Sequence, residues 1–479
     1  MLSKKPPYLI INTGLSGKAA LRLLKVLGVS PQEIFTYDSS DTSADFNNAE
    51  VAYEKVRPQT IIVSPGYPLS TPWIQRARSA NVEITSELSL AAPFFNGELK
   101  IGITGSVGKS TTAGLLNAGA SVEDPNCFLG GNYGYPLANY VADVLERKRP
   151  RARIAIIEIS SYQLENARGL SFDHSIITSL NENHLERYAS LDHYYLTKLS
   201  LLFRTQGHVV LNENGHDLFS YVNNLIAYFP ENGLRLSLPN ETAETAMDRV
   251  LLGFSRSQLP SDLTDVRQVL SSSLKKHDNL KQIHWTSSRF TDRCEIIGRH
   301  NRENLSLALR LGQILAFKPA SLNAIRSFRG LPHRIENLGV SGGIRFINDS
   351  KSTTIESVLV ALEACSDFSR TGTLFVLIGG RDKNLPWRKL QAFQGAPNME
   401  FVFFGECAEF ASQETRLSKN IHRSLGAALS WCKLNAQDQD TLLLSPGGSS
   451  LDEFKNFEER GNFFKSKMQD FSVKKAGGR

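Results

Sequence analysis

A glycine turn that carries a lysine and hydroxyl side chains lies between a predicted strand, 99–103, and the start of a predicted helix, 111–119. From 102 to 112 it reads G-I-T-G-S-V-G-K-S-T-T. Such a turn points backbone N–H groups at one spot, at the positive end of the helix dipole, where a phosphate binds. Lys109 would reach terminal phosphates and Ser110 would reach Mg²⁺. The run predicts a short phosphate loop, T-G-x-x-G-K-S-T, with an ordinary glycine turn as the alternative.

Three further side chains could act on a bound phosphate group. Glu158 closes an apolar strand over 153–159, where a carboxylate holds Mg²⁺ or is simply solvated. His184 follows the next strand, and a packed or capping histidine is its alternative. Lys198 falls on the apolar face of a predicted helix. Because a buried, unpaired charge is costly, this lysine either reaches solvent or is neutralised by covalent chemistry or a phosphate.

Alternating strands and helices predict how these residues are positioned. The first 38 residues read as strand, glycine turn, helix and strand, and the second strand ends at Asp38 in the manner of a dinucleotide-binding unit. Apolar runs of strand length continue at 60–63, 99–103, 153–159, 175–180, 208–211, 344–347, 373–378, 401–404 and 441–444. Ligands of parallel sheets bind at the carboxyl ends of the strands, which is where the candidate residues fall.

The pattern predicts an α/β protein of three domains, each a mostly parallel, doubly wound sheet. We expect a Rossmann-like domain over 1–95, a central ATPase of the phosphate-loop type over 96–330, and a Rossmann-like domain over 331–479. The stretch 230–295 is polar and weakly patterned, so irregular strands and loops are expected there. Polar groups near Asp349 lie on loops of the third domain, where surface ion pairing is the alternative to ligand binding.

Composition narrows the class of protein. A net charge of +6 spread over 479 residues, with no block of lysine or arginine singled out, favours a nucleotide or another anionic substrate over nucleic acid. The five cysteines are scattered and form no C-x-x-C pair, so neither a zinc site nor a disulfide framework is indicated. No apolar run approaches membrane-spanning length. We expect a monomer in a reduced, cytoplasmic setting.

These pieces together resemble the Mur ligases, ATP-dependent amide-forming enzymes of peptidoglycan assembly. The matching stretches span nearly the whole chain in family order. They are T-G-S-V-G-K-S-T from 104, G-G-N-Y-G from 130, E-I-S-S-Y-Q-L-E from 158, N-E-N-H-L-E-R-Y from 181, H-N-R-E-N from 300, L-P-H-R-I-E from 331, N-D-S-K-S-T from 348, G-G-R-D-K from 379 and S-P-G-G-S-S-L-D-E-F-K-N-F-E-E-R-G-N-F-F from 445. The last stretch is typical of the D-glutamate-adding members.

The resemblance implies a role for each set of matching residues. The ATP set is Gly105, Gly108, Lys109, Ser110, Thr111, Asn304, Arg334 and Asp349. The UDP-sugar set is Leu15, Ser16, Asp38, Ser39, Ser64, Asn132 and His184. The D-glutamate set is Lys351, Thr353, Lys383, Ser450, Leu451 and Phe457. The catalytic set is Lys109, Glu158, His184 and Lys198, and the metal set is Ser110, Glu158, His184 and carbamylated Lys198.

The activity that the resemblance implies is the addition of D-glutamate to UDP-N-acetylmuramoyl-L-alanine. The reaction would proceed through an acyl phosphate, release ADP and phosphate, and use two Mg²⁺ ions. Carbamylation of Lys198 by CO₂ would turn an inward-facing lysine into a metal-binding anion. The reaction is a cytoplasmic step of peptidoglycan synthesis, and therefore of cell wall biogenesis, cell shape, cell cycle and cell division. No nucleic-acid or membrane partner is expected.

Four departures from the family pattern stand out. Val107 replaces a usual Asn, Asn183 replaces a usual acid, Arg381 replaces an acid that is displaced to Asp382, and 230–295 is longer than expected. One alternative is a different ligase of the superfamily, such as a folylpolyglutamate-synthase-like enzyme, against which the final motif argues. Another is a non-catalytic nucleotide-binding regulator, although such a protein would be expected to have lost a catalytic residue.

Overall fold

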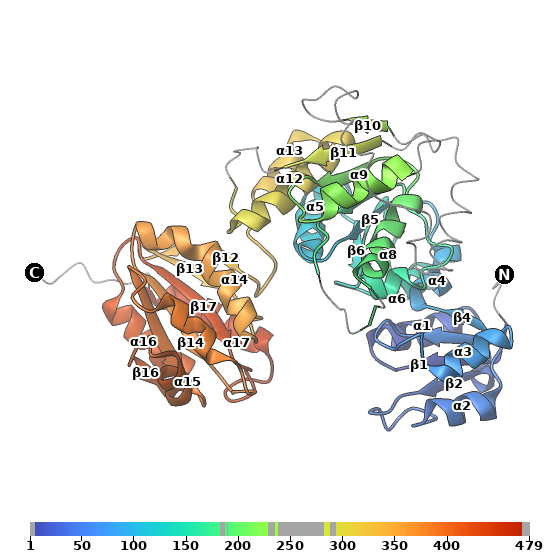
Figure 1. The fold of residues 1–479 in the computed structure, drawn as a ribbon, viewed down its shortest axis with the longest axis horizontal. Coiled ribbons are helices and arrows are strands. Elements are labelled where there is room, and N and C mark those ends of the chain that lie inside the picture. Colours follow the sequence, from blue (N-terminus) through green and yellow to red (C-terminus); the bar gives the residue numbers. More distant parts are fainter. Residues whose placement is uncertain are drawn as a thin grey trace, which may run out of the picture. The chain divides into compact units, whose positions relative to one another are not determined.

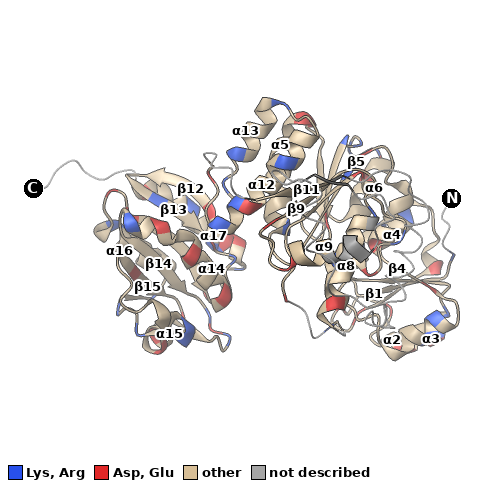
Figure 2. Ribbon diagram, turned by 45° about the horizontal axis from the view of Figure 1, so that its top comes forward, with Lys and Arg blue, Asp and Glu red and all other residues tan. Residues whose placement is uncertain are grey.

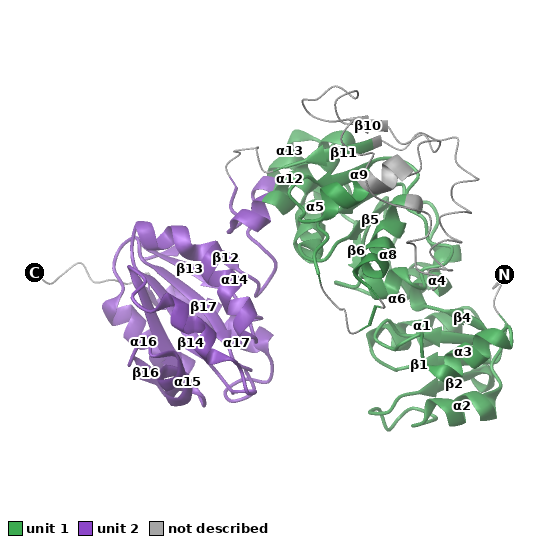
Figure 3. Ribbon diagram, viewed as in Figure 1, with its two compact units in different colours: residues 1–290, 303–325 green, residues 291–302, 326–479 purple. Residues whose placement is uncertain are grey.

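The computed structural model describes residues 5–182, 187–188, 190–228, 235–237, 282–287 and 294–471. Its strands form three separate sheets with helices between them (Figure 1). The chain divides into two compact units, unit 1 with residues 1–290 and 303–325 and unit 2 with residues 291–302 and 326–479 (Figure 3). The predicted α/β class with three mostly parallel sheets is confirmed. The domain limits near 95 and 330 stay predictions.

The first sheet has four parallel strands in the order β2-β1-β3-β4. Its strands are β1 (Tyr8–Ile11), β2 (Ile34–Tyr37), β3 (Thr60–Val63) and β4 (Glu83–Thr85), and its helices are α1 (Leu15–Val26), α2 (Ala49–Val56), α3 (Pro72–Ser79) and α4 (Glu87–Ala91). The two central strands are buried along their whole length, as a sheet covered on both faces requires.

The second sheet has seven parallel strands in the order β10-β11-β9-β8-β5-β7-β6. Its strands are β5 (Leu99–Thr104), β6 (Phe128–Gly131), β7 (Ile154–Glu158), β8 (His174–Ile177), β9 (Val209–Asn212), β10 (Arg235–Ser237) and β11 (Gln282–Thr286). Its helices are α5 (Lys109–Glu123), α6 (Leu137–Leu145), α7 (Ser161–Leu164), α8 (Leu191–Phe203), α9 (Leu218–Tyr228), α12 (Arg299–Ile314) and α13 (Pro319–Arg326). The central position of β5 places the glycine turn between its neighbours β7 and β8. Most of 230–295 lies outside the described residues.

The third sheet has six strands in the order β12-β13-β17-β14-β15-β16, all parallel except for the β12–β13 pair. Its strands are β12 (Glu336–Ser341), β13 (Ile344–Asn348), β14 (Leu374–Gly379), β15 (Met399–Phe404), β16 (Ile421–His422) and β17 (Thr441–Gly447), and its helices are α14 (Ile355–Cys365), α15 (Ala408–Thr415), α16 (Leu425–Asn435) and α17 (Phe457–Lys467). Short 3₁₀ helices are η1 (Pro31–Glu33), η2 (Ala92–Phe94), η5 (Ser366–Arg370), η6 (Trp387–Phe393) and η7 (Met468–Phe471). Separate apolar clusters cover the two faces of the third sheet, one with α14 and α15 and one with α16 and α17.

The first two sheets share one hydrophobic core. Side chains of α1 and α4, such as Leu24 and Leu88, belong to the same buried cluster as Leu137 and Tyr140 of α6. At the edge of this core, the Arg22 guanidinium pairs with Asp143 at 2.6 Å and also with a second carboxylate of the same segment. Unit 1 is therefore held together by apolar packing across the two sheets.

In the view of Figure 2, lysine and arginine residues are interspersed with aspartate and glutamate residues in each unit. This distribution agrees with the modest net charge of +6. The five cysteines, all of which the structure describes, are free thiols. Among the helices of the described ranges, none combines the length and the apolar character that crossing a bilayer requires.

Glu87 gives the shared core a pH dependence. It is 4% exposed, and its carboxylate accepts a hydrogen bond from the backbone N–H of Ala138 in the first turn of α6 at 2.5 Å. Burial raises the pKa of Glu87 to about 7, and the hydrogen bond offsets only part of this effect. A raised carboxyl pKa means that stability is fully present below the unfolded-state pKa near 4.5 and is lost as the pH rises through about 7.

We therefore expect Glu87→Gln to have a higher free energy of unfolding than the wild-type chain at pH 8, by about 2–4 kcal/mol, and to show little gain at pH 5. Denaturant melts at the two pH values measure this difference. Glu54→Gln, which changes an exposed carboxylate, serves as the control. Equal stabilisation by Glu87→Gln at both pH values would rule out the buried carboxyl as the cause.

Candidate active site

The glycine turn after β5 adopts a shape that only glycine fits at two positions. Gly105 and Gly108 have φ values of +146° and +86°. A Cβ on Gly105 would lie 2.0 Å from Oγ1 of Thr178, and one on Gly108 would lie 2.4 Å from Oδ1 of Asn304. The turn leads directly into α5, so its N–H groups lie at the positive end of that helix. The geometry is that of an anion-binding loop.

Two hydroxyl residues after β8 hold this loop in place. The N–H of Val107 donates to Oγ of Ser179 at 3.1 Å, and Oγ1 of Thr178 donates to the carbonyl oxygen of Val107. The N–H of Ser106 donates to the carbonyl oxygen of Ser179 at 2.9 Å. Neither Thr178 nor Ser179 was among the predicted site residues, although hydroxyls at the carboxyl end of a neighbouring strand were a usable signal.

Lys109 and Lys198 converge on one carbonyl oxygen. Nζ of Lys109 donates to the carbonyl of Gly105 at 2.9 Å, and Nζ of Lys198 donates to the same oxygen at 2.8 Å. Lys198 lies in α8, is 2% exposed and has the ring of Tyr194 4.7 Å from its nitrogen. Burial, and then the charge of Lys109, lower the pKa of Lys198 to about 6, against a smaller opposing effect of Glu158. At that pKa, most of the Lys198 amine is neutral at pH 7.

Glu158 lies at the end of β7 beside the phosphate loop, with Ile103 of β5 as its partner in the strand register. Its Oε1 accepts a hydrogen bond from the side-chain amide of Asn132 at 2.6 Å. Its Oε2 is buried and has no hydrogen-bond partner within the described residues. Because an unpartnered buried carboxylate oxygen is costly, this atom fits a site for a hard cation such as Mg²⁺.

The other predicted metal ligands stand as follows. Ser110 lies in the first turn of α5 and is half-buried, and His184 and Asn183 lie outside the described residues. Within the ranges that the structure describes, no group of three or more His, Cys, Asp or Glu side chains forms a metal-binding cluster.

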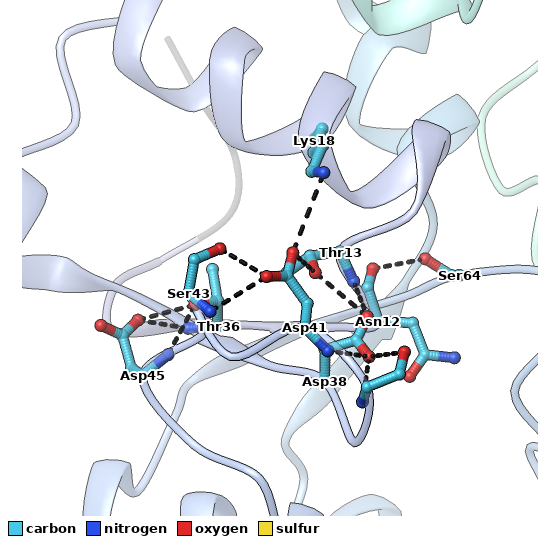
Figure 4. A network of polar contacts seen from close by, with 10 residues as sticks. Asn12, Thr13, Lys18, Thr36, Asp38, Asp41, Ser43, Asp45 and Ser64 are labelled. Atoms are coloured by element: carbon cyan, nitrogen blue, oxygen red, sulfur yellow. Dashed lines mark hydrogen bonds and ion pairs between the residues drawn. The ribbon is translucent and has the colours of Figure 1, made fainter.

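Two predicted UDP-sugar residues of the first sheet, Asp38 and Ser64, lie in a polar network at the carboxyl ends of β2 and β3 (Figure 4). Asp38 accepts hydrogen bonds from the N–H and the hydroxyl of Thr13 at 2.8 and 3.0 Å and from the N–H of Ser40 at 2.9 Å. These bonds, led by that of the Ser40 N–H, hold the pKa of Asp38 well below its usual range. The hydroxyl of Ser64 donates to the carbonyl oxygen of Asn12 at 2.9 Å.

The remaining members of the UDP-sugar set differ in how far they are exposed to solvent. Leu15 is 79% exposed at the start of α1, Ser16 is half-buried and Ser39 is exposed. Asn132 lies in the central sheet, where its amide orients Glu158. The set is thus divided between the rim of the first sheet and the end of β6.

A small pocket of unit 1 lies between the end of β3 and α7. Its lining residues are Val63, Ser64, Pro65, Tyr67, Leu69, Ser86, Tyr162, Gln163, Asn166 and Arg187. The guanidinium of Arg187 lies over the ring of Tyr162 at 4.2 Å, pairs with Glu165 at 2.8 Å and donates to the carbonyl oxygen of Tyr67 at 3.4 Å. Arg187 and Gln163 were not predicted, and both lie within motifs that carry the family resemblance.

Two residues of the predicted ATP set belong to unit 2: Arg334 precedes β12, and Asp349 follows β13. Asp349 is buried, and its carboxylate accepts hydrogen bonds from the N–H of Ile335 at 3.1 Å and the hydroxyl of Ser445 at 2.8 Å. Burial raises the pKa of Asp349 to about 7, and these bonds lower it in part. Arg334 is exposed on the preceding loop. Asn304, from the same predicted set, lies in unit 1, where it packs behind Gly108 and Thr112.

The predicted D-glutamate residues lie on loops at the carboxyl ends of adjacent strands of the third sheet. Lys351 and Thr353 follow β13, Ser450 and Leu451 follow β17, and Lys383 follows β14. Phe457 begins α17, and Nζ of the lysine after β13 lies 5.5 Å from its ring. The structure thus brings all six residues to one edge of one sheet.

Two of the four departures from the family pattern, at Val107 and at the Arg381–Asp382 pair, lie wholly within the described residues. Val107 is 53% exposed, and its backbone rather than its side chain is held by neighbours. Arg381 points to solvent and pairs with Glu406 at 2.9 Å. Asp382 instead organises the turn, accepting hydrogen bonds from the N–H of Leu385 at 3.1 Å and the indole of Trp387 at 2.9 Å.

Comparison with known proteins places this geometry in a family. The Mur ligase middle domain model matches residues 103–312. A UDP-N-acetylmuramoylalanine–D-glutamate ligase of Buchnera aphidicola is 30% identical over 471 residues, which cover 95% of this chain and 96% of that protein. The ligase of the same name from Myxococcus xanthus is 29% identical over 482 residues, with the same shares covered.

Solved structures show the same fold. The crystal structure of MurF ligase from Thermotoga maritima in complex with ADP aligns with a TM-score of 0.50 at 12% identity, covering 86% of this chain and 89% of that chain. The resemblance drawn from the motifs, including that to the D-glutamate-adding ligases, is confirmed by the relatives of similar length. With a phosphate loop, three sheets and end-to-end similarity in agreement, the chain belongs to the Mur ligase family.

Proposed function

We propose that this chain is a cytoplasmic ATP-dependent ligase that joins D-glutamate to UDP-N-acetylmuramoyl-L-alanine and releases ADP and phosphate. The observation that carries the proposal is the convergence of Lys109 and Lys198 on the Gly105 carbonyl, beside the unpartnered oxygen of Glu158. The relatives that match the whole chain are named for this reaction. No partner beyond these substrates is needed for the chemistry.

The phosphate loop would hold the triphosphate of ATP. Backbone N–H groups at the start of α5 would contact phosphate oxygens at the positive end of that helix. Lys109 now donates to two carbonyl oxygens of its own loop, Gly105 at 2.9 Å and Ser106 at 3.2 Å. An ammonium group can exchange such neutral acceptors for phosphate oxygens, because charged acceptors bind it more strongly. Lys109 would then stabilise the charge of the transferred phosphoryl group.

The first chemical step would activate a poor acyl donor. A carboxylate oxygen of the UDP-sugar substrate would bond to the γ-phosphorus of ATP as the bond from that phosphorus to the ADP oxygen breaks. The amine of D-glutamate would then attack the acyl carbon and lose a proton, and phosphate would leave. The pocket lined by Ser64 and Gln163 would hold the sugar portion, while loops after β13 and β17 would hold the amino acid.

Glu158, Ser110 and carbamylated Lys198 would hold Mg²⁺, with His184 for a second ion. When bound, Mg²⁺ supplies charge neutralisation on the transferred phosphoryl group. Lys198 is suited to carbamylation because its neutral amine can attack CO₂, forming an N–C bond and releasing a proton. Asn132 would fix the orientation of Glu158, and thus aim its second oxygen at the metal.

Phosphate release tests the proposed reaction directly. We expect release from ATP only when UDP-N-acetylmuramoyl-L-alanine and D-glutamate are both present. Lys109→Met should lower kcat at least ~100-fold, since it removes a charge that acts in the transition state. Release with another amino acid but none with D-glutamate would contradict the substrate assignment.

Glu158→Gln should raise the Mg²⁺ concentration for half-maximal activity about 10-fold or more, because an amide oxygen carries no charge for the ion. A Mg²⁺ titration of initial rates measures this shift. Glu54→Gln, which is distant from the loop in sequence and exposed, provides the matched control. An unchanged Mg²⁺ requirement in the Glu158→Gln variant would remove Glu158 from the metal site.

Activity should depend on CO₂ in a manner set by the pKa of Lys198. With a pKa of about 6, roughly 99% of this amine is neutral at pH 8 but only about 10% at pH 5. We expect depletion of CO₂ to lower the rate, and bicarbonate to restore it at pH 8 far more than at pH 5. Lys198→Met should be nearly inactive and insensitive to bicarbonate. A wild-type rate that ignores CO₂ at both pH values would exclude the carbamate.

A further inference from the structure

Arg460 is a fully buried guanidinium in a part of unit 2 to which no role has been given above. It lies in the first turn of α17 and is 0% exposed. Burial lowers the pKa of Arg460 to about 10, so the side chain still carries its charge at pH 7. A buried charge is costly unless its donors are satisfied, and its place in the fold therefore needs a physical reason.

Its hydrogen bonds join two loops. Nε donates to the hydroxyl of Ser350 at 3.1 Å, Nη2 donates to the carbonyl oxygen of Ser350 at 2.9 Å, and Nη1 donates to the carbonyl oxygen of Gly448 at 3.1 Å. The acceptors are neutral oxygens, so the side chain forms a fork between backbones rather than an ion pair. Only arginine offers donors in this rigid planar arrangement.

Each loop that the fork holds carries residues of the predicted D-glutamate set. Ser350 immediately precedes Lys351, and Gly448 lies two residues before Ser450. The hydroxyl of Ser350 in turn donates to the carbonyl oxygen of Phe457 at 2.8 Å. One guanidinium therefore ties the β13 loop, the β17 loop and the start of α17 to one another.

Close packing leaves the guanidinium little freedom. A Cβ on Gly380, in the loop that leads to Lys383, would lie 3.0 Å from Nη1 of Arg460. A Cβ on Gly461, the next residue of α17, would lie 2.0 Å from Nδ1 of His333. The helix thus packs directly against its neighbours. A shift of the helix therefore cannot restore the hydrogen bonds to the two loops if Arg460 is replaced.

We propose that Arg460 is a positioning residue that sets the spacing of the amino-acid-binding loops. It is too deeply buried to touch substrate and acts through Ser350 and Gly448. The inference rests on the proposed function for the identity of the amino acid. Its effect should be largest on the amino acid, because the fork holds the loops of the predicted D-glutamate set directly, whereas the phosphate loop and the sugar pocket lie in unit 1.

The test compares Arg460→Lys and Arg460→Met in the full-length chain, with KM measured separately for D-glutamate, ATP and the UDP-sugar. Lysine keeps the charge, but it cannot donate hydrogen bonds to both loops in the planar arrangement of the guanidinium. We expect its KM for D-glutamate to rise at least ~10-fold, with the KM for the UDP-sugar within about 2-fold of wild type. The KM for ATP, whose predicted ligand Asp349 adjoins Ser350, should rise less than the KM for D-glutamate. Ser350→Ala, which removes one acceptor and keeps the carbonyl, should give a smaller rise of the same kind.

Lys465→Met is the matched control, because it removes a cation from the same helix whose partner is Glu336, at 2.7 Å. Its KM values should not change. If Arg460→Met does not fold, the Arg460→Lys and Ser350→Ala variants still decide the question. Equal KM values for D-glutamate in these two variants and the wild type, with only a lower melting temperature, would overturn the inference. A wild-type chain that shows no D-glutamate-dependent phosphate release would instead overturn the proposed function.

Discussion

The carbonyl oxygen of Gly105 accepts hydrogen bonds from two lysine side chains, and much of the site follows from that contact. Two amines close to one oxygen cannot both be charged without mutual repulsion in a region of low dielectric. Lys109 is partly exposed at the start of α5, whereas Lys198 is buried in α8. Burial, with the charge of Lys109 as the second cause, therefore lowers the pKa of Lys198.

The same need to limit buried charge explains the surroundings of the loop. Asn132 satisfies one oxygen of Glu158 and leaves the other unpartnered within the described structure. Tyr194 covers Lys198 and donates to the hydroxyl of Ser106, which in turn contacts the carbonyl oxygen of Asn181. Neutral side chains thus fix the positions of the charged ones.

The local features of this site could be predicted from sequence, because they depend on short-range patterns. The strand before the loop, Glu158 at a strand end and the inward face of Lys198 each follow from apolar periodicity. Strands β6, with two glycines, and β16, with two residues, escaped notice because their pairing depends on neighbours distant in sequence.

The contacts that join separate segments could not be predicted. Nothing in the spacing of Thr178 shows that its hydroxyl meets the backbone of Val107, since that contact depends on the register of β8 beside β5. The arginine fork of α17 depends likewise on the pairing of β13 with β17. The family resemblance identified the loops of the predicted site, but it did not identify the atoms whose contacts hold those loops together.

The core shared by the first two sheets has a consequence for ligand recognition. The pocket that contains Ser64 and Tyr162 takes its walls from both sheets, and these are joined by α1, α4 and α6. A molecule that touches both walls meets surfaces whose separation is already set, so no hinge has to be immobilised on its arrival.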